Sequence, residues 1–224
     1  YIDGDWQAER RFDHFALRTM NPEKCAEFYA EVLELAPSNR EEGDENYYLT
    51  DGRITLVLMP WDIQNYAGTG ITRSGPDHFG FKVRNIAEVL AAWRAAGLEV
   101  QSEFTGAEGF DNAYLIAPDG VKIELQEDIT LSVKAEAYHV HFFTGGHIEL
   151  MDWYIDMFSA VQRARGTHPN TADVPGINLS FNGSRAERVP TQGRAIDHIG
   201  FEVDDLDAFA RALEERGIEL EFSP

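Results

Sequence analysis

The chain has 224 residues, of which 43% are hydrophobic, and its formal net charge is −20. This size and apolar content are enough for two domains with ordinary cores. The negative charge argues against nucleic acids and anionic membrane surfaces as partners, and no segment predicts a membrane span. The single cysteine, Cys25, cannot form an internal disulfide, so we expect a cytoplasmic protein.

The first predicted element is a strand, Phe12–Arg18. A helix is expected over Pro22–Leu33, because apolar residues recur there at steps of three and four residues. Asn21 stands before a proline at the first helical position, which is typical of a capped helix start. Two further strands are expected around 46–49 and 53–59, joined by an Asp-Gly hairpin turn.

The same order of elements follows a second time. A strand at His78–Val83 precedes an amphipathic helix at Ile86–Ala96, which a glycine ends. Three strands are then expected at Leu98–Glu103, Ala113–Ala117 and Val121–Gln126, with an Asp-Gly turn before the last. The repetition predicts one structural module used more than once.

A third module begins with a strand at 138–142, and its helix carries Trp153-Tyr154. A fourth begins at Ile196–Phe201, and its helix is expected over Leu206–Arg216. The sequence stops at Pro224, before the strands that would close this module, so we expect a fragment without its C-terminal hairpin.

These elements predict an α+β protein of tandem strand–helix–strand–strand–strand modules. We expect an N-terminal lead over residues 1–11 and a first domain of two modules over 12–128. A linker over 129–137 would then connect it to a second two-module domain over 138–224.

Three residues in the first two modules predict a metal site. His14 and His78 stand at the same place in two similar strands, each preceded by aspartate and followed by phenylalanine, and Glu124 lies in the closing strand of the second module. Two imidazoles and one carboxylate can hold a divalent metal and leave further positions open. We therefore predict that His14, His78 and Glu124 are its ligands.

A second candidate site involves His139 and His198. Tyr29 and Tyr154 stand 15 residues after His14 and His139, which makes these two histidines counterparts. His198 corresponds to His78, but the matching carboxylate would fall beyond the end of the sequence. His141 is an additional histidine on the same face as His139. We interpret two others as surface residues: His147 and His168.

The strand sequences Asp-His-Phe-Ala-Leu-Arg, Asp-His-Phe-Gly-Phe-Lys-Val and Asp-His-Ile-Gly-Phe-Glu-Val resemble those of the vicinal oxygen chelate superfamily. That group includes glyoxalases, fosfomycin-resistance enzymes, bleomycin-resistance proteins and extradiol dioxygenases. The resemblance extends from about Phe12 onward and implies modules paired into open-barrel cups around a metal. The fold hosts several chemistries, so the reaction has to come from the site.

The resemblance is closest to the extradiol dioxygenases. Alignment of the two Asp-Gly turns puts Leu56 where glyoxalases have a fourth, carboxylate ligand. Tyr114, followed by Ala117-Pro118-Asp119-Gly120 and Glu124, matches the dioxygenase pattern and implies a catalytic hydrogen-bond donor. The histidines expected near 105–107 and 63–66 are missing, which weighs against catechol cleavage.

We therefore expect an extradiol-type dioxygenase that acts on a small catechol-like substrate with adjacent oxygens. The alternatives are a metal-dependent lyase, isomerase or transferase of the glyoxalase or fosfomycin-resistance kind, and a non-catalytic binder of the bleomycin-resistance kind. The expected metal is iron(II) or manganese(II), with zinc or nickel as alternatives, and the chain could pair into homodimers. The candidate pocket walls are Phe15, Trp61, Phe79 and Phe81.

Overall fold

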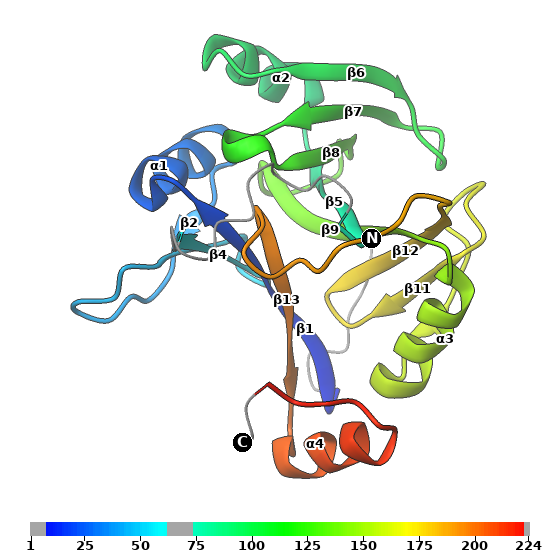
Figure 1. Ribbon diagram of the computed structural model, residues 1–224. Coiled ribbons are helices and arrows are strands. Elements are labelled where there is room, and N and C mark those ends of the chain that lie inside the picture. The colour runs from blue at the N-terminus through cyan, green and yellow to red at the C-terminus, as the bar shows by residue number, and fades with distance from the viewer. Residues whose placement is uncertain (1–7, 62–73, 222–224) are drawn as a thin grey trace.

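The computed structural model describes residues 8–61 and 74–221. The chain repeats a strand, a helix and a group of short strands (Figure 1). The first module comprises β1 (Arg10–Thr19), α1 (Pro22–Leu33), β2 (Ala36–Pro37), β3 (Tyr47–Thr50) and β4 (Thr55–Pro60). The second comprises β5 (Pro76–Val83), α2 (Ile86–Ala95), β6 (Val100–Thr105), β7 (Asp111–Ile116), a 3-10 turn (Pro118–Gly120) and β8 (Lys122–Glu127).

The other two modules follow without a break. The third comprises β9 (Ala135–Thr144), α3 (His147–Phe158), β10 (Val161–Gln162), β11 (Thr171–Val174) and β12 (Ile177–Gly183). The fourth contributes β13 (Ile196–Val203) and α4 (Leu206–Glu215). The predicted α+β class and the repeated module are confirmed.

Side-chain caps define where three of the helices begin. The side chain of Asn21 accepts a hydrogen bond from the backbone N–H of Lys24 at 3.0 Å, and Asn85 does the same for Glu88 at 3.1 Å. Asp205 caps α4 in the same way. Each bond satisfies a backbone donor that the first turn of a helix leaves unpaired.

The strands form two open sheets whose pairing crosses the order of the modules. The larger sheet runs β10-β11-β12-β9-β5-β8-β7-β6, and the smaller runs β13-β1-β4-β3-β2. The second and third modules thus share one sheet through β5 and β9, and β1 pairs with β13 of the fourth module. We had predicted that the first two modules form one cup within residues 12–128, and the observed pairing does not follow that boundary.

The first and second modules meet back to back through their apolar faces. The rings of Phe15 on β1 and Phe79 on β5 stack with centroids 4.7 Å apart, and both side chains are buried in the core. Successive side chains of a strand point to opposite faces, so His14 and His78 each point away from this contact. Phe15, Phe79 and also Phe81 therefore fill the core, which corrects their predicted place as pocket walls.

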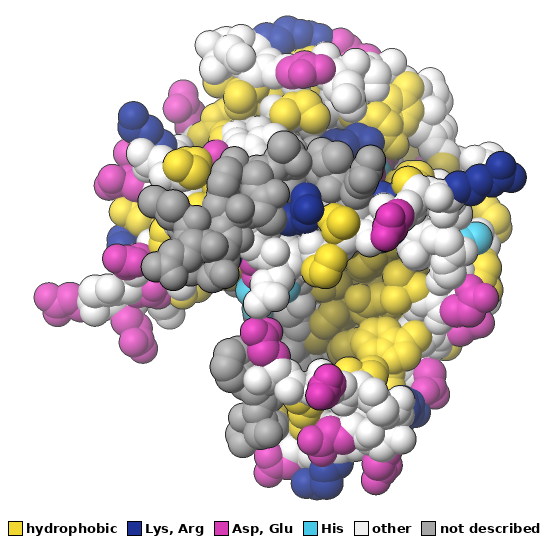
Figure 2. All heavy atoms as spheres, viewed as in Figure 1, with side chains coloured by type: hydrophobic (Ala, Val, Ile, Leu, Met, Phe, Trp, Pro, Cys, Tyr) yellow, Lys and Arg dark blue, Asp and Glu magenta, His cyan; other side chains and the backbone are white. Residues whose placement is uncertain are grey.

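Acidic side chains are spread over the face of the molecule drawn in Figure 2. Among the described residues, no helix has both the length and the apolar character that crossing a membrane requires.

Candidate metal centre

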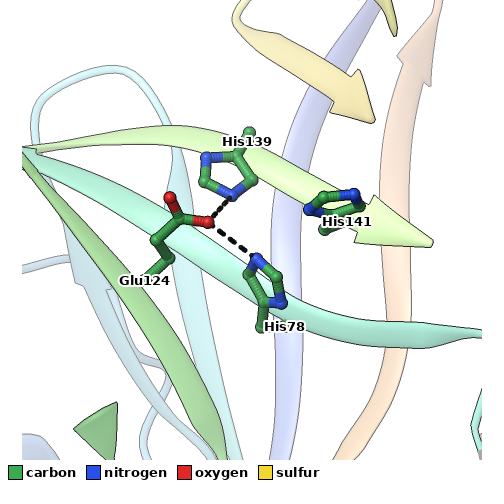
Figure 3. A group of neighbouring side chains, drawn as sticks. All are labelled: His78, Glu124, His139 and His141. Atoms are coloured by element: carbon green, nitrogen blue, oxygen red, sulfur yellow. Dashed lines mark hydrogen bonds and ion pairs between the residues drawn. The ribbon is translucent and has the colours of Figure 1, made fainter. Parts of the chain in front are cut away.

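Four buried side chains converge on one point of the larger sheet (Figure 3). They are His78 on β5, Glu124 on β8, and His139 and His141 on β9. Each offers a nitrogen or oxygen atom, and these atoms lie within 4.8 Å of one another. We call this group the histidine–glutamate cluster.

Strand register brings the cluster together. β5 lies between β8 and β9, with Gly80 opposite both Glu124 and His139, and with His78 opposite His141. Residues opposite one another in a sheet share a face, so all four side chains project to the same side.

Gly80 leaves the space that the ring of His139 occupies. A Cβ atom built on Gly80 falls well under 3.0 Å from that ring. The imidazole therefore lies directly over the backbone of β5, and only glycine permits this position.

The carboxylate of Glu124 is held at both oxygens. Its Oε2 lies 2.9 Å from Nε2 of His78 and 3.2 Å from Nε2 of His139. Its Oε1 accepts a hydrogen bond of 2.6 Å from the side-chain amide of Asn112 on β7. Because Asn112 occupies Oε1, Oε2 is the oxygen turned toward the imidazoles.

The outer nitrogen of His78 also has a partner. Its Nδ1 lies 2.8 Å from Oδ1 of Asp77, and Asp77 pairs with Lys122 at 3.0 Å. Hydrogen bonds of this kind fix the tautomer and the ring orientation of metal-binding histidines. The Nε2 atom of His78 is thereby oriented toward the centre of the cluster.

Several nitrogen atoms of the cluster are buried without a hydrogen-bond partner. These are Nε2 of His139, whose contact with Glu124 is not aligned as a hydrogen bond, and both ring nitrogens of His141. Buried polar atoms are normally satisfied, and a metal ion is one means of satisfying imidazole nitrogens. The donor set of three imidazoles and one carboxylate therefore fits a divalent metal.

The protonation states of the cluster favour a cation. Burial alone would raise the pKa of Glu124, but the imidazoles of His139 and His78 hold it well below its usual range. Burial, with the nearby charge of Arg165, lowers the pKa of His139 to about 3. Burial and the neighbouring imidazoles also lower the pKa of His141. Near neutral pH the imidazoles of His139 and His141 are thus neutral and the carboxylate is ionised, which are the protonation states that bind a metal.

These shifts predict that the metal-free protein loses stability as the pH falls from about 6.5 toward 3. In that range the unfolded chain takes up a proton on His139 that the folded chain excludes, at about 1.4 kcal/mol per pKa unit. Urea unfolding at about pH 7 and about pH 5 should show a lower free energy of unfolding at the acidic value. The loss should be smaller in His139→Gln and unchanged in His198→Gln. Equal pH dependence in all three proteins would contradict this account.

Asn112 should control metal affinity through Glu124, although it offers no ligand itself. We expect Asn112→Ala to weaken binding of a divalent metal by about 10- to 100-fold, as loss of a partner to a metal ligand usually does. Competition titration with a metal-chelating dye measures this affinity. Asn182→Ala, on β12 of the same sheet, is the matched control and should bind as the unmodified protein does.

The structure places the other predicted ligands in a separate pair. His14 on β1 and His198 on β13 have ring centroids 5.3 Å apart, and their Nδ1 atoms contact Asp13 and Asp197. The ring of His14 lies over Gly200, as that of His139 lies over Gly80. We had grouped His14 with His78 and Glu124, and His139 with His198. In the structure His139 lies with His78, and His14 lies with His198. The reason is that β5 pairs with β9 and β1 pairs with β13.

Tyr114, the predicted catalytic residue, lies beside the cluster. It stands opposite Glu124 on β7, and its ring is 5.2 Å from that of His78. The Nζ atom of Lys122 lies 4.1 Å from its ring centroid. Burial and the charges of Glu124 and Asp77 raise its pKa, so its hydroxyl is protonated and can donate a hydrogen bond.

The remaining predicted residues lie elsewhere. Trp61 donates from its indole nitrogen to the backbone oxygen of Gly193 at 2.8 Å, so it contacts the segment before the fourth module. Leu56 is buried, and the register places Val57 rather than Leu56 at the position corresponding to Glu124. In the third module that position is Ser180, opposite His141. Neither place carries a carboxylate.

Two residues near the cluster were missed or misjudged from the sequence. His168, interpreted as a surface residue, packs against His141 with ring centroids 5.2 Å apart. Arg165 is buried, and its NH1 atom lies 3.2 Å from Nδ1 of His139. Both belong to the loop between β10 and β11, where neither periodicity nor a motif marks them.

The fold and the site define a class of protein, and sequence comparison agrees. The family model for the Glyoxalase/Bleomycin resistance protein/Dioxygenase superfamily matches residues 11–125. The chain belongs to this superfamily, and its predicted resemblance is confirmed. A search of curated proteins finds no match.

Solved structures show the same fold. Glyoxalase I from Zea mays is similar with a TM-score of 0.69 and 16% identity, over 92% of this chain and 79% of that chain. A mutant of that enzyme gives a TM-score of 0.72 and 15% identity, over 92% and 80%. A Bacillus subtilis protein with a provisional assignment as a dioxygenase gives 0.57 and 13%, over 78% and 65%. Identities this low establish the fold alone.

Proposed function

We propose that the chain is a metal-dependent enzyme whose centre is the histidine–glutamate cluster, and that it is an extradiol-type dioxygenase for a small substrate with two adjacent oxygens. The observation that carries this proposal is the donor set. Two neutral imidazoles and a single carboxylate, with other positions open, are typical of iron(II) sites that react with oxygen, and His78, His139 and Glu124 supply that set. The position where a second carboxylate would stand carries Ser180.

A divalent ion bound at this place would supply Lewis acidity toward the two substrate oxygens and, as iron(II), a path for electrons from the substrate to O2. His78, His139 and Oε2 of Glu124 are the residues that would hold it, with His141 as a fourth donor. The hydrogen bond from Asn112 fixes the orientation of the Glu124 carboxylate, and the hydrogen bond to Asp77 fixes the orientation of the His78 ring.

The chain's own residues also provide a hydrogen-bond donor and a further imidazole. Tyr114 is protonated and lies against His78, where its hydroxyl can orient a substrate oxygen. His168 adds an imidazole beside His141. The sequence has no histidine at the two places expected for a dioxygenase. His168, from the third module, is the imidazole that could take over such a role.

The test is metal content and oxygen uptake. Protein purified without chelators or a nickel column should contain iron or manganese and consume oxygen with at least one member of a catechol panel. His78→Ala should lose both. A metal-loaded protein that consumes no oxygen with any catechol would contradict the dioxygenase assignment.

A lyase or isomerase is the second candidate, and His141 favours it. With His141 the cluster offers four protein donors, which is the number that the resemblance implies for glyoxalases. Oxygen-independent turnover of a thiol adduct of a 2-oxoaldehyde, lost in His78→Ala, would support this function. Binding of a ligand that survives both metal removal and His78→Ala would instead support a non-catalytic binder.

A further inference from the structure

Arg165 is a buried cation without an ionic partner. Its exposed fraction is 8%, and among the described residues it forms no ion pair. Its Nε atom is buried with no hydrogen-bond partner, and its guanidinium lies 5.3 Å from the ring centroid of Tyr138. Burying an uncompensated charge is costly, so proteins normally pair it or use it to bind an anion.

A tight turn fixes Arg165 against the cluster. The backbone groups of Arg165 and His168 bond to each other in both directions at 2.9 Å, and Thr167 donates to the backbone oxygen of Ala107 at 3.0 Å. Gly166 has a φ of +56° and lies against Ala107, so a side chain there would collide with the second module. The loop of the third module is thus held against the β6–β7 turn of the second.

The position of the charge is unusual for a metal site. The outer nitrogen of a metal-binding histidine normally faces an acceptor, such as a carboxylate or a backbone oxygen. Here Nδ1 of His139 faces a guanidinium instead, at 3.2 Å. A guanidinium only donates, so without metal Nδ1 accepts and the ring proton is on Nε2; a metal on Nε2 would move that proton to Nδ1, beside the guanidinium. A positive charge therefore stands one imidazole ring away from the place of the metal.

The other charged groups do not reverse this sign. Asp77 pairs with Lys122, and Lys82 pairs with Asp128, so each pair is neutral together. Glu108 accepts a hydrogen bond from Tyr138 and lines the same small cavity as Arg165, so it offsets part of this charge without forming an ion pair.

Among the residues that the structure describes, Glu124 supplies the one negative charge of the cluster, so a divalent ion there leaves the centre net positive. A polar cavity of about 30 Å³ beside the guanidinium has room for a water molecule, which can satisfy Nε but adds no charge.

We propose that Arg165 is a specificity-determining residue and that the centre selects ligands that bind as anions, through a carboxylate, enolate or phenolate oxygen. This inference rests on the proposed metal-dependent function and deepens it. Val57 and Ser180 stand at the positions that correspond to Glu124, and neither carries a carboxylate. The anionic oxygen of the ligand would supply the negative charge that a second carboxylate would otherwise give. It also reconciles a chain of net charge −20 with an anionic substrate, because the positive charge is local.

The test compares a charged and a neutral probe on the same centre. Protein loaded with Co²⁺ is titrated with azide, a monoanion, and separately with imidazole, which is neutral, while the visible d–d absorption of Co²⁺ is followed. We expect Arg165→Gln to weaken azide binding by about 10-fold or more, the scale of one charge at short range in a partly buried site. Imidazole binding should be unchanged, and Co²⁺ affinity should hold or rise, because a repelling charge is gone.

Two further variants serve as controls. Arg165→Lys keeps the charge and should retain azide binding close to that of the unmodified protein. Arg163→Gln removes an exposed arginine two residues before Arg165, one that pairs with Asp173, and it should change nothing.

The outcomes separate this inference from the proposed function. Unmodified protein that takes up no Co²⁺ overturns both. Unmodified protein that binds Co²⁺ and azide, beside an Arg165→Gln variant with the same azide affinity, overturns the role of Arg165 alone. Equal weakening of azide, imidazole and Co²⁺ in Arg165→Gln would mean that the arginine only supports the fold, and this also overturns the proposal.

Discussion

Glu124→Gln should abolish metal binding at working concentrations while the fold persists. The substitution keeps the shape of the side chain and removes the one negative charge that the cluster offers, so we expect the affinity for a divalent metal to fall by about 100-fold or more. Loss of a partner to a metal ligand alone costs about 10- to 100-fold, and Glu124 itself contacts two of the imidazoles.

Mass spectrometry of the metal content and a chelator-competition titration measure the effect. Glu103→Gln, on β6 of the same sheet, is the matched control: it also removes one carboxylate, but from an exposed pair with Arg94. Glu124→Gln protein with full metal content would show that the cluster does not hold the ion. Loss of metal in both variants would point to a general effect of charge.

Gly80→Ala should displace His139 and lower metal affinity as strongly as removal of that histidine does. The added methyl group would lie within a forbidden distance of the imidazole, so the ring has to leave its place over β5. Forcing extra atoms into a packed interior also costs about 1–3 kcal/mol of stability. Denaturant unfolding separates this cost from the loss of metal.

The chain contains its own control for this experiment. Gly200→Ala creates the same collision, but with the ring of His14 in the other sheet. We expect a smaller loss of stability, because the side chain of His14 is partly exposed and can move aside, and no loss of metal. If the two alanine variants lost metal equally, the centre would depend on the whole fold rather than on the space above Gly80.

The modules and most of their elements could be predicted from the sequence, because they follow from local patterns. The helix at Pro22–Leu33 was predicted with the bounds that the structure shows, since its apolar spacing and the cap at Asn21 lie within one segment. Glu124 and His78 were recognised as partners because they belong to one module, where β5 and β8 pair.

Which modules pair with each other was harder to predict, because the local sequence of a strand does not show which distant strand it pairs with. We assumed that neighbouring modules share a cup, which brought His14 into the site instead of His139. One signal was present: the first strands of modules two and four have glycine two residues after the histidine, at Gly80 and Gly200. Each glycine makes room for a histidine ring from another module, and modules one and three lack it.

His168 and Arg165 could not have been found in this way. They reach the cluster because a loop of the third module bonds to Ala107 in the second, a contact that depends on the folded arrangement. Loop residues carry no periodicity that would reveal their direction, so their role follows from the structure alone.

The central claim is that the second and third modules build the metal centre. The most direct test is the metal content of three proteins purified in parallel without chelators: the unmodified chain, His139→Ala and His14→Ala. The account predicts near-stoichiometric metal in the unmodified chain and in His14→Ala, and its loss in His139→Ala. Metal that persists in His139→Ala and disappears in His14→Ala would contradict the account and place the centre between the first two modules.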